Sequence, residues 1–154
     1  MLVKEFMIHD VIHVHPQTSL KELLRILVKH RIGGVPVVNE KEELLGMVSD
    51  GDVIRYLSPK EEAVHDLFYT VYVEEGQTEK EVLAEKINDQ VEEAMRTKHL
   101  YIIREDEEFE QAVRLFSQHH FKKLPVLNDS GVVTGVISRG DIIRNLSKMI
   151  IELN

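Results

Sequence analysis

An internal repeat is the strongest constraint on the fold of this chain. The segment from Leu45 to Arg55 reads LGMVSDGDVIR, and the segment from Thr134 to Arg144 reads TGVISRGDIIR. A second matched pair lies upstream, VPVVN and LPVLN, at the same offset of 89 residues. A constant offset of this kind means that one structural unit is used twice. The sequence therefore predicts two copies of one unit within 154 residues, so that a site on one copy has a twin on the other.

Composition argues against several classes of protein. A hydrophobic content of 43% is enough for a core, and the absence of cysteine excludes disulfides, thiolate metal sites and a cysteine nucleophile. The sequence has neither a long apolar run nor a basic and apolar leader, which argues against a membrane span and against secretion. The formal net charge of −8 opposes nucleic-acid binding. We therefore expect a cytoplasmic protein that binds neither nucleic acid nor membranes.

The alternation of apolar and polar residues predicts the order β-α-β-β-α in each copy. The fold class is thus α/β (α+β), with three expected segments: 1–57 for the first copy, 58–90 for a connector and 91–154 for the second copy with a C-terminal helix. Most of the acidic excess falls in the connector, which is expected to be helical from Thr78 onward and is too short for a core of its own. The first strands are expected at Val11–Val14 and Leu100–Ile103.

The repeated pattern Gly-h-h-Ser-x-x-Asp, in which h is hydrophobic, carries the chemistry. Ser49 and Ser138 lie where a strand leads into a helix, and backbone N–H groups at a helix N-terminus bind anions. Asp52 and Asp141 follow in the first helical turn, where a carboxylate can accept hydrogen bonds from sugar hydroxyls. The pattern predicts a nucleotide site. A plain capping box, which needs no ligand, is the alternative for either copy.

These segments resemble the CBS (cystathionine-β-synthase) domain, and the two copies resemble a CBS pair, or Bateman module. The resemblance covers roughly residues 3–57 and 91–147, and it includes HRIGGVPVV from His30, HHFKKLPVL from His119, and the opening residues Met7 and Met95. It implies a regulatory module with pseudo-two-fold symmetry rather than a catalyst. It also implies two clefts for adenosine-type ligands such as AMP, ADP, ATP or S-adenosylmethionine.

In the family pattern the serine contacts phosphate and the aspartate contacts ribose, which marks Ser49 and Asp52 in the first copy and Ser138 and Asp141 in the second. The base is held near the first strand and near the strand that contains proline. The resemblance therefore implies base contacts at Val35, Pro36, Tyr101, Ile102, Leu124 and Pro125.

The two copies differ in charge beside the motif. Arg139 follows Ser138, whereas Asp50 follows Ser49, and the lysines Lys122 and Lys123 replace a pair of glycines in the first copy. Since cations favour phosphate, we expect the Ser138/Asp141 site to bind it, with His120, Lys122, Lys123 and Arg139 as the positive wall. The Ser49/Asp52 site is expected to be weak, empty or suited to a ligand without phosphate.

Other readings have less support in the sequence. His9, His13 and His15 do not form a strong zinc pattern, so no metal or other cofactor is expected. No nucleophile elbow, P-loop or dinucleotide fingerprint is present, which argues against an enzyme. The alternatives left open are a pair that binds S-adenosylmethionine, an interaction scaffold without ligand, and a nucleic-acid binder that uses the basic second copy.

The expected protein is a free-standing sensor of an adenine nucleotide, which acts through its own oligomer or through an unidentified effector protein. Each copy has two apolar helix faces, and the chain ends near the apolar run Met149–Ile151. One compact pair cannot cover all of these faces, so we expect a homodimer.

Overall fold

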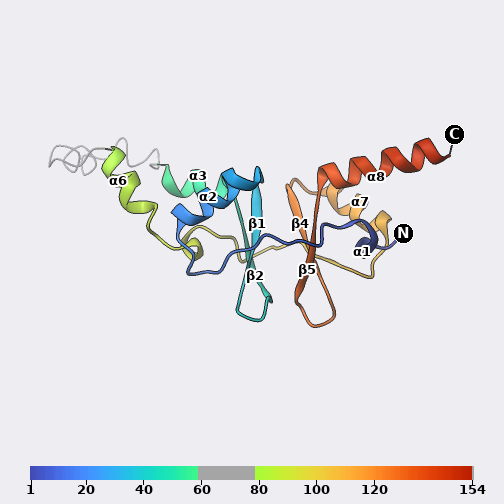
Figure 1. The fold of residues 1–154 in the computed structure, drawn as a ribbon, viewed down its shortest axis with the longest axis horizontal. Coiled ribbons are helices and arrows are strands. Elements are labelled where there is room, and N and C mark those ends of the chain that lie inside the picture. The colour runs from blue at the N-terminus through green and yellow to red at the C-terminus, as the bar shows by residue number, and fades with distance from the viewer. Residues whose placement is uncertain (59–78, 154) are drawn as a thin grey trace.

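The computed structural model of this chain describes residues 1–58 and 79–153. Within these ranges the two repeats form matching units of helix and strand, side by side about a pseudo-two-fold axis (Figure 1). The first unit contains α2 (Leu20–His30), β1 (Gly34–Val38), β2 (Leu44–Ser49) and α3 (Asp50–Leu57). The second contains α7 (Phe109–Gln118), β4 (Lys123–Leu127), β5 (Val133–Ser138) and α8 (Arg139–Glu152). The predicted α+β class with tandem repeats is confirmed.

Four shorter elements complete the described chain. They are α1 (Val3–Phe6), α6 (Glu79–Lys86), the 3-10 helix η1 (Val91–Glu93) and β3 (Ile103–Arg104). α6 agrees with the helix expected in the second half of the connector, whereas residues 59–78 lie outside the described ranges. The three-segment division of the chain stays a prediction.

Each unit is organised around one antiparallel hairpin. In the first hairpin Val35 lies opposite Val48, and in the second Leu124 lies opposite Ile137. The equivalent registers bring Ser49 and Ser138 to the end of the last strand, directly before α3 and α8. Each hairpin therefore delivers its serine to the N-terminus of a helix, as the motif predicts.

The first strand of each unit is shorter than the sequence predicts. In the second unit only Ile103 and Arg104 pair with β4, in parallel, and in the first unit a single bridge joins Val14 to Val37. Tyr101 turns outward, with 41% of its surface exposed, and stacks on the ring of His119 at a centroid distance of 3.9 Å. The chain joins the sheet at Ile103, two residues after this stacked side chain.

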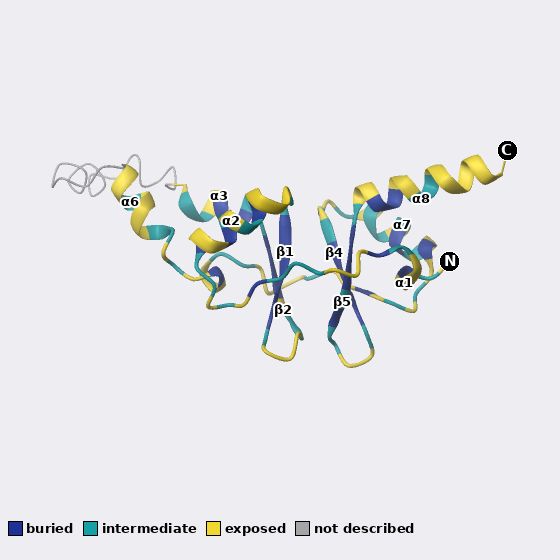
Figure 2. Cartoon of the chain, viewed as in Figure 1, coloured by how far each residue is buried: buried dark blue, intermediate teal, exposed yellow. Residues whose placement is uncertain are grey.

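The two hydrophobic cores lie between the hairpins and the helices that flank them (Figure 2). Strand residues such as Val35, Val37, Leu124 and Val126 are fully buried, and so are Leu20 and Leu23 of α2. Spacing of apolar residues along α2 and α7 follows one helix face, as predicted, and Ser49 and Ser138 cap α3 and α8. The cores hold the two helix starts in fixed positions.

The repeats exchange their opening segments. Residues 1–8 lie against the second unit before the chain crosses to the first, so that Val3 and Met7 belong to the core of the second unit (Figure 1). In return, Val91 belongs to the core of the first unit. The backbone of Ile8 pairs with Val136 of β5 through two hydrogen bonds of 2.9 and 3.1 Å. Each core is therefore completed by chain from the other half of the sequence.

Two glycines of the repeated motif allow this exchange. At Gly46 of β2, an added Cβ would lie 2.6 Å from the carbonyl oxygen of Arg96. At Gly135 of β5, it would lie 2.8 Å from Cγ of Met7. At Gly46 a methyl group would meet backbone and has no room, whereas at Gly135 the side chain of Met7 would have to shift; the glycine that opens the motif therefore allows the close approach of the opening segments.

Candidate ligand-binding site

The two serines form reciprocal caps with the aspartates three residues further on. The Asp52 N–H donates to Ser49 Oγ at 3.3 Å, and the N–H and hydroxyl of Ser49 both donate to Asp52 Oδ2 at 2.9 Å. Ser138 and Asp141 repeat this arrangement, with an N–H to Oδ2 distance of 2.7 Å. The capping box is therefore present in both copies, and it fixes both carboxylates under the start of a helix.

Both aspartates are buried and paired with arginine. Asp52 is 6% exposed and Asp141 is 4% exposed. The Arg55 Nη2 atom donates to Asp52 Oδ1 at 2.8 Å, and Arg144 pairs with Asp141 in the same way. A buried carboxylate needs this compensation, because an unpaired charge in the interior is costly. The aspartates thus have a structural role that exists without any ligand.

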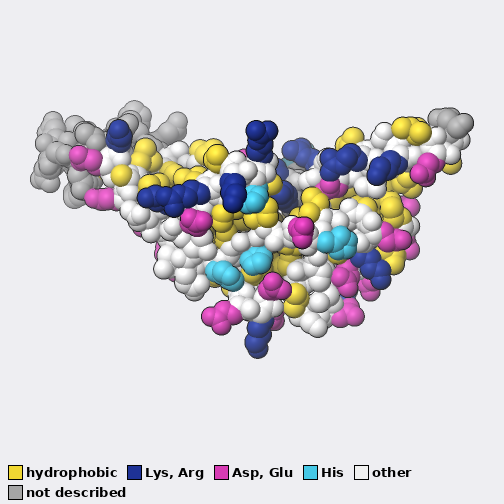
Figure 3. Space-filling view, viewed as in Figure 1, with side chains coloured by type: hydrophobic (Ala, Val, Ile, Leu, Met, Phe, Trp, Pro, Cys, Tyr) yellow, Lys and Arg dark blue, Asp and Glu magenta, His cyan; other side chains and the backbone are white. Residues whose placement is uncertain are grey.

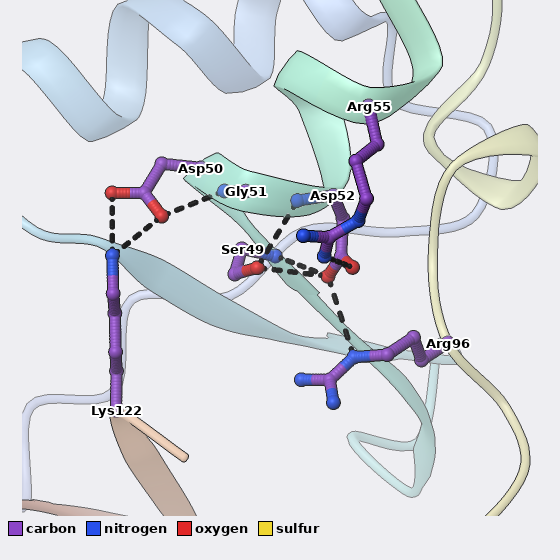
Figure 4. Close-up of polar contacts among 7 residues, drawn as sticks. All are labelled: Ser49, Asp50, Gly51, Asp52, Arg55, Arg96 and Lys122. Carbon is purple, nitrogen blue, oxygen red and sulfur yellow. Dashed lines mark hydrogen bonds and ion pairs between the residues drawn. The ribbon is translucent and has the colours of Figure 1, made fainter. Parts of the chain in front are cut away.

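Arg96 distinguishes the first copy from the second. It lies in the exchanged segment after η1, and its Nε is 3.4 Å from Asp52 Oδ2. Figure 4 shows its two terminal nitrogens directed away from Asp52, toward the side on which Lys122 lies. Those nitrogens make no hydrogen bond with the residues that the structure describes. Ile8 occupies the matching place against β5, so the second copy has no counterpart of this cation.

A cavity of about 350 Å³ opens beside Ser49. It is bounded by the end of β2, the start of α3, the exchanged segment with Arg96, and the chain that leads into β4. The lining residues from the first half are Gly34, Met47, Val48, Ser49, Asp50, Gly51 and Arg55, and those from the second half are Arg96, His120, Phe121, Lys122 and Lys123. The cavity is therefore built by both repeats, and cations outnumber acids in its wall.

Asp50 and Lys122 join the two repeats across this cavity. Lys122 Nζ donates to Asp50 Oδ1 at 2.7 Å and to Oδ2 at 3.0 Å (Figure 4). The hydrogen bond from Lys122 lowers the pKa of Asp50, against the opposing effect of partial burial. Lys123, half-buried nearby, has a pKa lowered by burial, and the charge of Asp141 partly opposes that shift. Asp50 is the one acid in a wall of cations.

A known protein family matches both repeats of the chain. A family model for the CBS domain matches residues 3–59 and 91–148. This chain belongs to the CBS domain family. Because the two matches coincide with the two repeats, the chain is a CBS pair, as the sequence motifs suggested. The family thus accounts for both the tandem repeat and the pseudo-two-fold arrangement.

Two curated relatives show how far the likeness extends. Protein MJ1426 of Methanocaldococcus jannaschii is 26% identical, and the match covers 95% of this chain and 91% of that protein. The chloroplastic CBS domain-containing protein CBSX1 of Arabidopsis thaliana is 30% identical, with 92% of this chain and 62% of that protein covered. The chain therefore spans nearly all of the first relative and less than two thirds of the second.

Solved structures share the fold of this CBS pair. The CBS-pair protein CBSX2 of Arabidopsis thaliana has a TM-score of 0.74 at 26% identity, with 99% of this chain and 97% of that chain covered. CBSX2 has also been crystallised in complex with AMP, and that structure has a TM-score of 0.72 at 24% identity, with 96% and 97% covered. The CBS pair of protein MJ0100, in complex with 5′-methylthioadenosine and S-adenosyl-L-methionine, has a TM-score of 0.71 at 23% identity, with 97% and 98% covered.

Three of the four cationic residues expected near Ser138 border the cavity at Ser49. His120, Lys122 and Lys123 line the cavity at Ser49, although the sequence assigned them to Ser138 in their own repeat. Lys123 also lies opposite Ser138 in the second hairpin, and its side chain interacts with the charge of Asp141, so the start of β4 lies between the two motifs. Arg139 does not line this cavity and is exposed at the first position of α8. Most of the Lys and Arg side chains in Figure 3 lie along the upper part of that face, over the helices.

The expected base contacts separate into two groups. The side chains of Val35, Pro36, Leu124 and Pro125 are buried in the hairpins, so only their backbone remains for a ligand. Tyr101 and Ile102 are exposed, at 41% and 42%. Neither group lines the cavity at Ser49. These contacts stay predictions.

Sequence reasoning missed Arg96, although Met95 beside it marked the opening segment. The signal was a basic residue next to a family marker, but its partner lies in the other repeat. His9 and His13 line a separate cavity of about 330 Å³ with Asp10 and Glu42. Within residues 1–58 and 79–153, no group of three or more metal-ligating side chains is positioned to hold a metal ion. In the same ranges, no helix is long and apolar enough to span a bilayer.

Proposed function

We propose that this CBS pair is a regulatory module that binds an adenine nucleotide, AMP, ADP or ATP, and catalyses no reaction. The observation that carries the proposal is the cavity at Ser49, where Arg55, Arg96, Lys122 and Lys123 surround the N-terminus of α3. Guanidinium and ammonium groups at a helix start form the kind of environment that binds phosphate. CBSX2, which shares the fold, has been crystallised in complex with AMP, and this supports an adenosine ligand.

The phosphate is proposed for the Ser49 cavity rather than for the Ser138 site that the sequence favoured. The lysines line the first site, and Arg96 adds a cation that the second lacks. Ser138, Asp141 and Arg139 form the second proposed site, which also has Lys123 beside it but has no counterpart of Arg96. In each site the aspartate proposed to bind ribose already pairs with an arginine, Arg55 or Arg144, so a ribose hydroxyl would compete with that ion pair.

S-adenosylmethionine is the second candidate ligand, because the CBS pair of MJ0100 was crystallised with it. Its sulfonium is positively charged, and a cation-rich cavity disfavours it. A scaffold without ligand is the third reading.

Regulation would work by population shift. A ligand that contacts both repeats stabilises the arrangement in which it fits, and the change passes to a partner or to a second copy. Exposed apolar side chains such as Ile54, Ile143, Ile150 and Ile151 support a homodimer through α3 and α8. An effector protein and a cytoplasmic location remain parts of the proposal, which co-purification and fractionation would test.

Isothermal titration of the purified chain with AMP, ADP, ATP, S-adenosylmethionine and adenosine tests the proposal. Arg96→Gln and Arg139→Gln are a matched pair, since each removes one guanidinium beside one motif. A lost charge-assisted hydrogen bond of about 1.5 kcal/mol means a roughly tenfold loss of affinity. We expect that loss for ADP in Arg96→Gln and little change in Arg139→Gln. A loss of affinity in Arg139→Gln but not in Arg96→Gln would favour the Ser138 site as the phosphate site. No binding of any ligand would favour the scaffold.

A further inference from the structure

The carboxylate of Asp50 already accepts hydrogen bonds from the donors that an incoming anion would need. Asp50 is the first residue of α3, and its Oδ1 accepts from the N–H of Gly51 at 2.7 Å and from Lys122 Nζ at 2.7 Å. A helix N-terminal N–H and an ammonium are the groups with which proteins bind phosphate. Gly33 lies against the pair, since a Cβ there would be 3.4 Å from both Asp50 Oδ2 and Lys122 Cδ.

We infer that Asp50 is a built-in competitor for the anionic group of the ligand at the Ser49 cavity. Its carboxylate stands where a phosphate would bind, and a phosphate enters by displacing it from Lys122 and from the N–H of Gly51. Asp50 therefore determines specificity, because it admits only ligands whose negative charge outcompetes one carboxylate. The inference rests on the proposed nucleotide function and assigns to one residue the selection for phosphate.

The exchange of anions is feasible on the observed burial. The side chain of Asp50 is 42% exposed and that of Lys122 is 54% exposed, so their ion pair contributes little to stability. The freed carboxylate can rotate into water at low cost. A phosphate brings three oxygens and more charge than the carboxylate that it replaces.

Arg96 supplies the second half of the phosphate site. Its Nε is held by Asp52, and its terminal nitrogens are directed toward the Lys122 side of the cavity (Figure 4). The two terminal nitrogens of the guanidinium can pair with two phosphate oxygens. Once Asp50 is displaced, the phosphate lies between Lys122 and Arg96, both of which come from the second half of the chain.

The second motif has no such competitor. Arg139 stands at the position that matches Asp50, and its side chain makes no ion pair with any residue in the described ranges. The two sites therefore differ in the charge of one equivalent residue. An adenosyl ligand without phosphate gains nothing at Asp50, so the first site distinguishes AMP, ADP and ATP from adenosine.

Asp50→Asn tests the inference by a gain of affinity, which misfolding cannot mimic. The amide keeps the shape and can still accept from Gly51, but it loses the charge that competes for Lys122. Removal of a like charge a few ångströms from a phosphate corresponds to about a fivefold or larger change in affinity near a protein surface. We expect tighter binding of AMP, ADP and ATP by at least this factor, with adenosine unchanged. Asp50→Glu, which keeps the charge, is the matched control and is expected to bind as wild type does.

The outcomes separate this inference from the proposed function. If the wild type binds AMP and Asp50→Asn binds it equally or more weakly, the competitor role is wrong while the nucleotide function stands. If only Asp50→Asn binds, the competitor is strong and the inference is supported. If neither protein binds any of the three nucleotides, both the function and the inference fail. A loss of the AMP preference over adenosine in Lys122→Gln would add independent support.

Discussion

Several hydrogen bonds tie the end of the connector to the first repeat: the N–H groups of Leu20 and Lys21 donate to the carbonyls of Asp89 and Ile87, and one bond comes from a side chain of α3. The hydroxyl of Tyr56 in α3 donates to the carboxylate of Asp89 at 2.5 Å, and Lys86 Nζ lies 5.5 Å from the centre of the tyrosine ring. This hydrogen bond, together with partial burial and the charges of Asp89 and Glu93, raises the pKa of Tyr56 to about 12. The contact fixes the chain just before η1, the element that enters the core of the first unit.

Replacing Tyr56 by phenylalanine is expected to lower the free energy of unfolding by about 1 kcal/mol at neutral pH, the usual net value of one hydrogen bond. Because folding raises this pKa above the ordinary value of 10, the contribution is complete below pH 10 and is lost between pH 10 and about 12. Urea unfolding of both proteins across this window measures the effect. Tyr101→Phe is the control, and a difference that stays constant up to pH 12 would contradict the assignment.

Residue by residue, the sequence identifies local features and misses those that cross the molecule. The caps at Ser49 and Ser138 were predicted because a capping box needs only four consecutive residues. The contacts of Arg96 with Asp52 and of Lys122 with Asp50 join residues that lie 44 and 72 positions apart. No local pattern encodes contacts across a pseudo-two-fold axis, so the sequence did not predict that Lys122 reaches the first repeat, and its assignment to the Ser138 site stays a prediction.

At the scale of elements, the repeat pattern predicts the order of strands and helices but not how the first strands and the opening segments pair. The order of strands and helices was predictable, since hydrophobic periodicity reports it directly. The extent of the first strand was not predictable from periodicity. Val11–Val14 has the composition of a strand, but only Val14 pairs with a neighbouring strand. Val14 pairs with β1 and β3 pairs with β4, whereas the opening segments pair with the other edge of each hairpin: Ile8 pairs with β5 and Arg96 with β2.

Gly46→Ala is expected to disturb this pairing. The new methyl group would meet the carbonyl of Arg96 at 2.6 Å, and a backbone atom cannot move aside as a flexible side chain can. Overpacking of this kind costs about 1–3 kcal/mol of the free energy of unfolding. Gly140→Ala is the matched control, because its nearest neighbour is the flexible end of Arg144 at 3.3 Å and alanine favours a helix. Thermal unfolding that ranks Gly46→Ala as stable as Gly140→Ala would contradict the close approach.

At the scale of the whole molecule, neither repeat forms its hydrophobic core from its own residues alone. Val3 and Met7 pack with Ile103 and Phe109, and Val91 packs with Leu20 and Leu23. A third cluster, formed by Val38, Leu127 and Val133, joins the two hairpins directly. The two repeats are therefore joined by shared packing at several places.

This sharing predicts one cooperative unfolding transition for both repeats. Val91 is fully buried in the first unit although it belongs to the second repeat in sequence, and Val→Ala in a core costs about 2 kcal/mol. Because neither core is complete alone, we expect Val91→Ala to lower the unfolding free energy of β1, β2, β4 and β5 by the same amount. Native-state hydrogen exchange measures each strand separately. Val3→Ala, the reciprocal variant, should give the same uniform loss. A loss confined to one hairpin would show that the repeats unfold independently and would remove the exchange as a route for coupling between the two motifs.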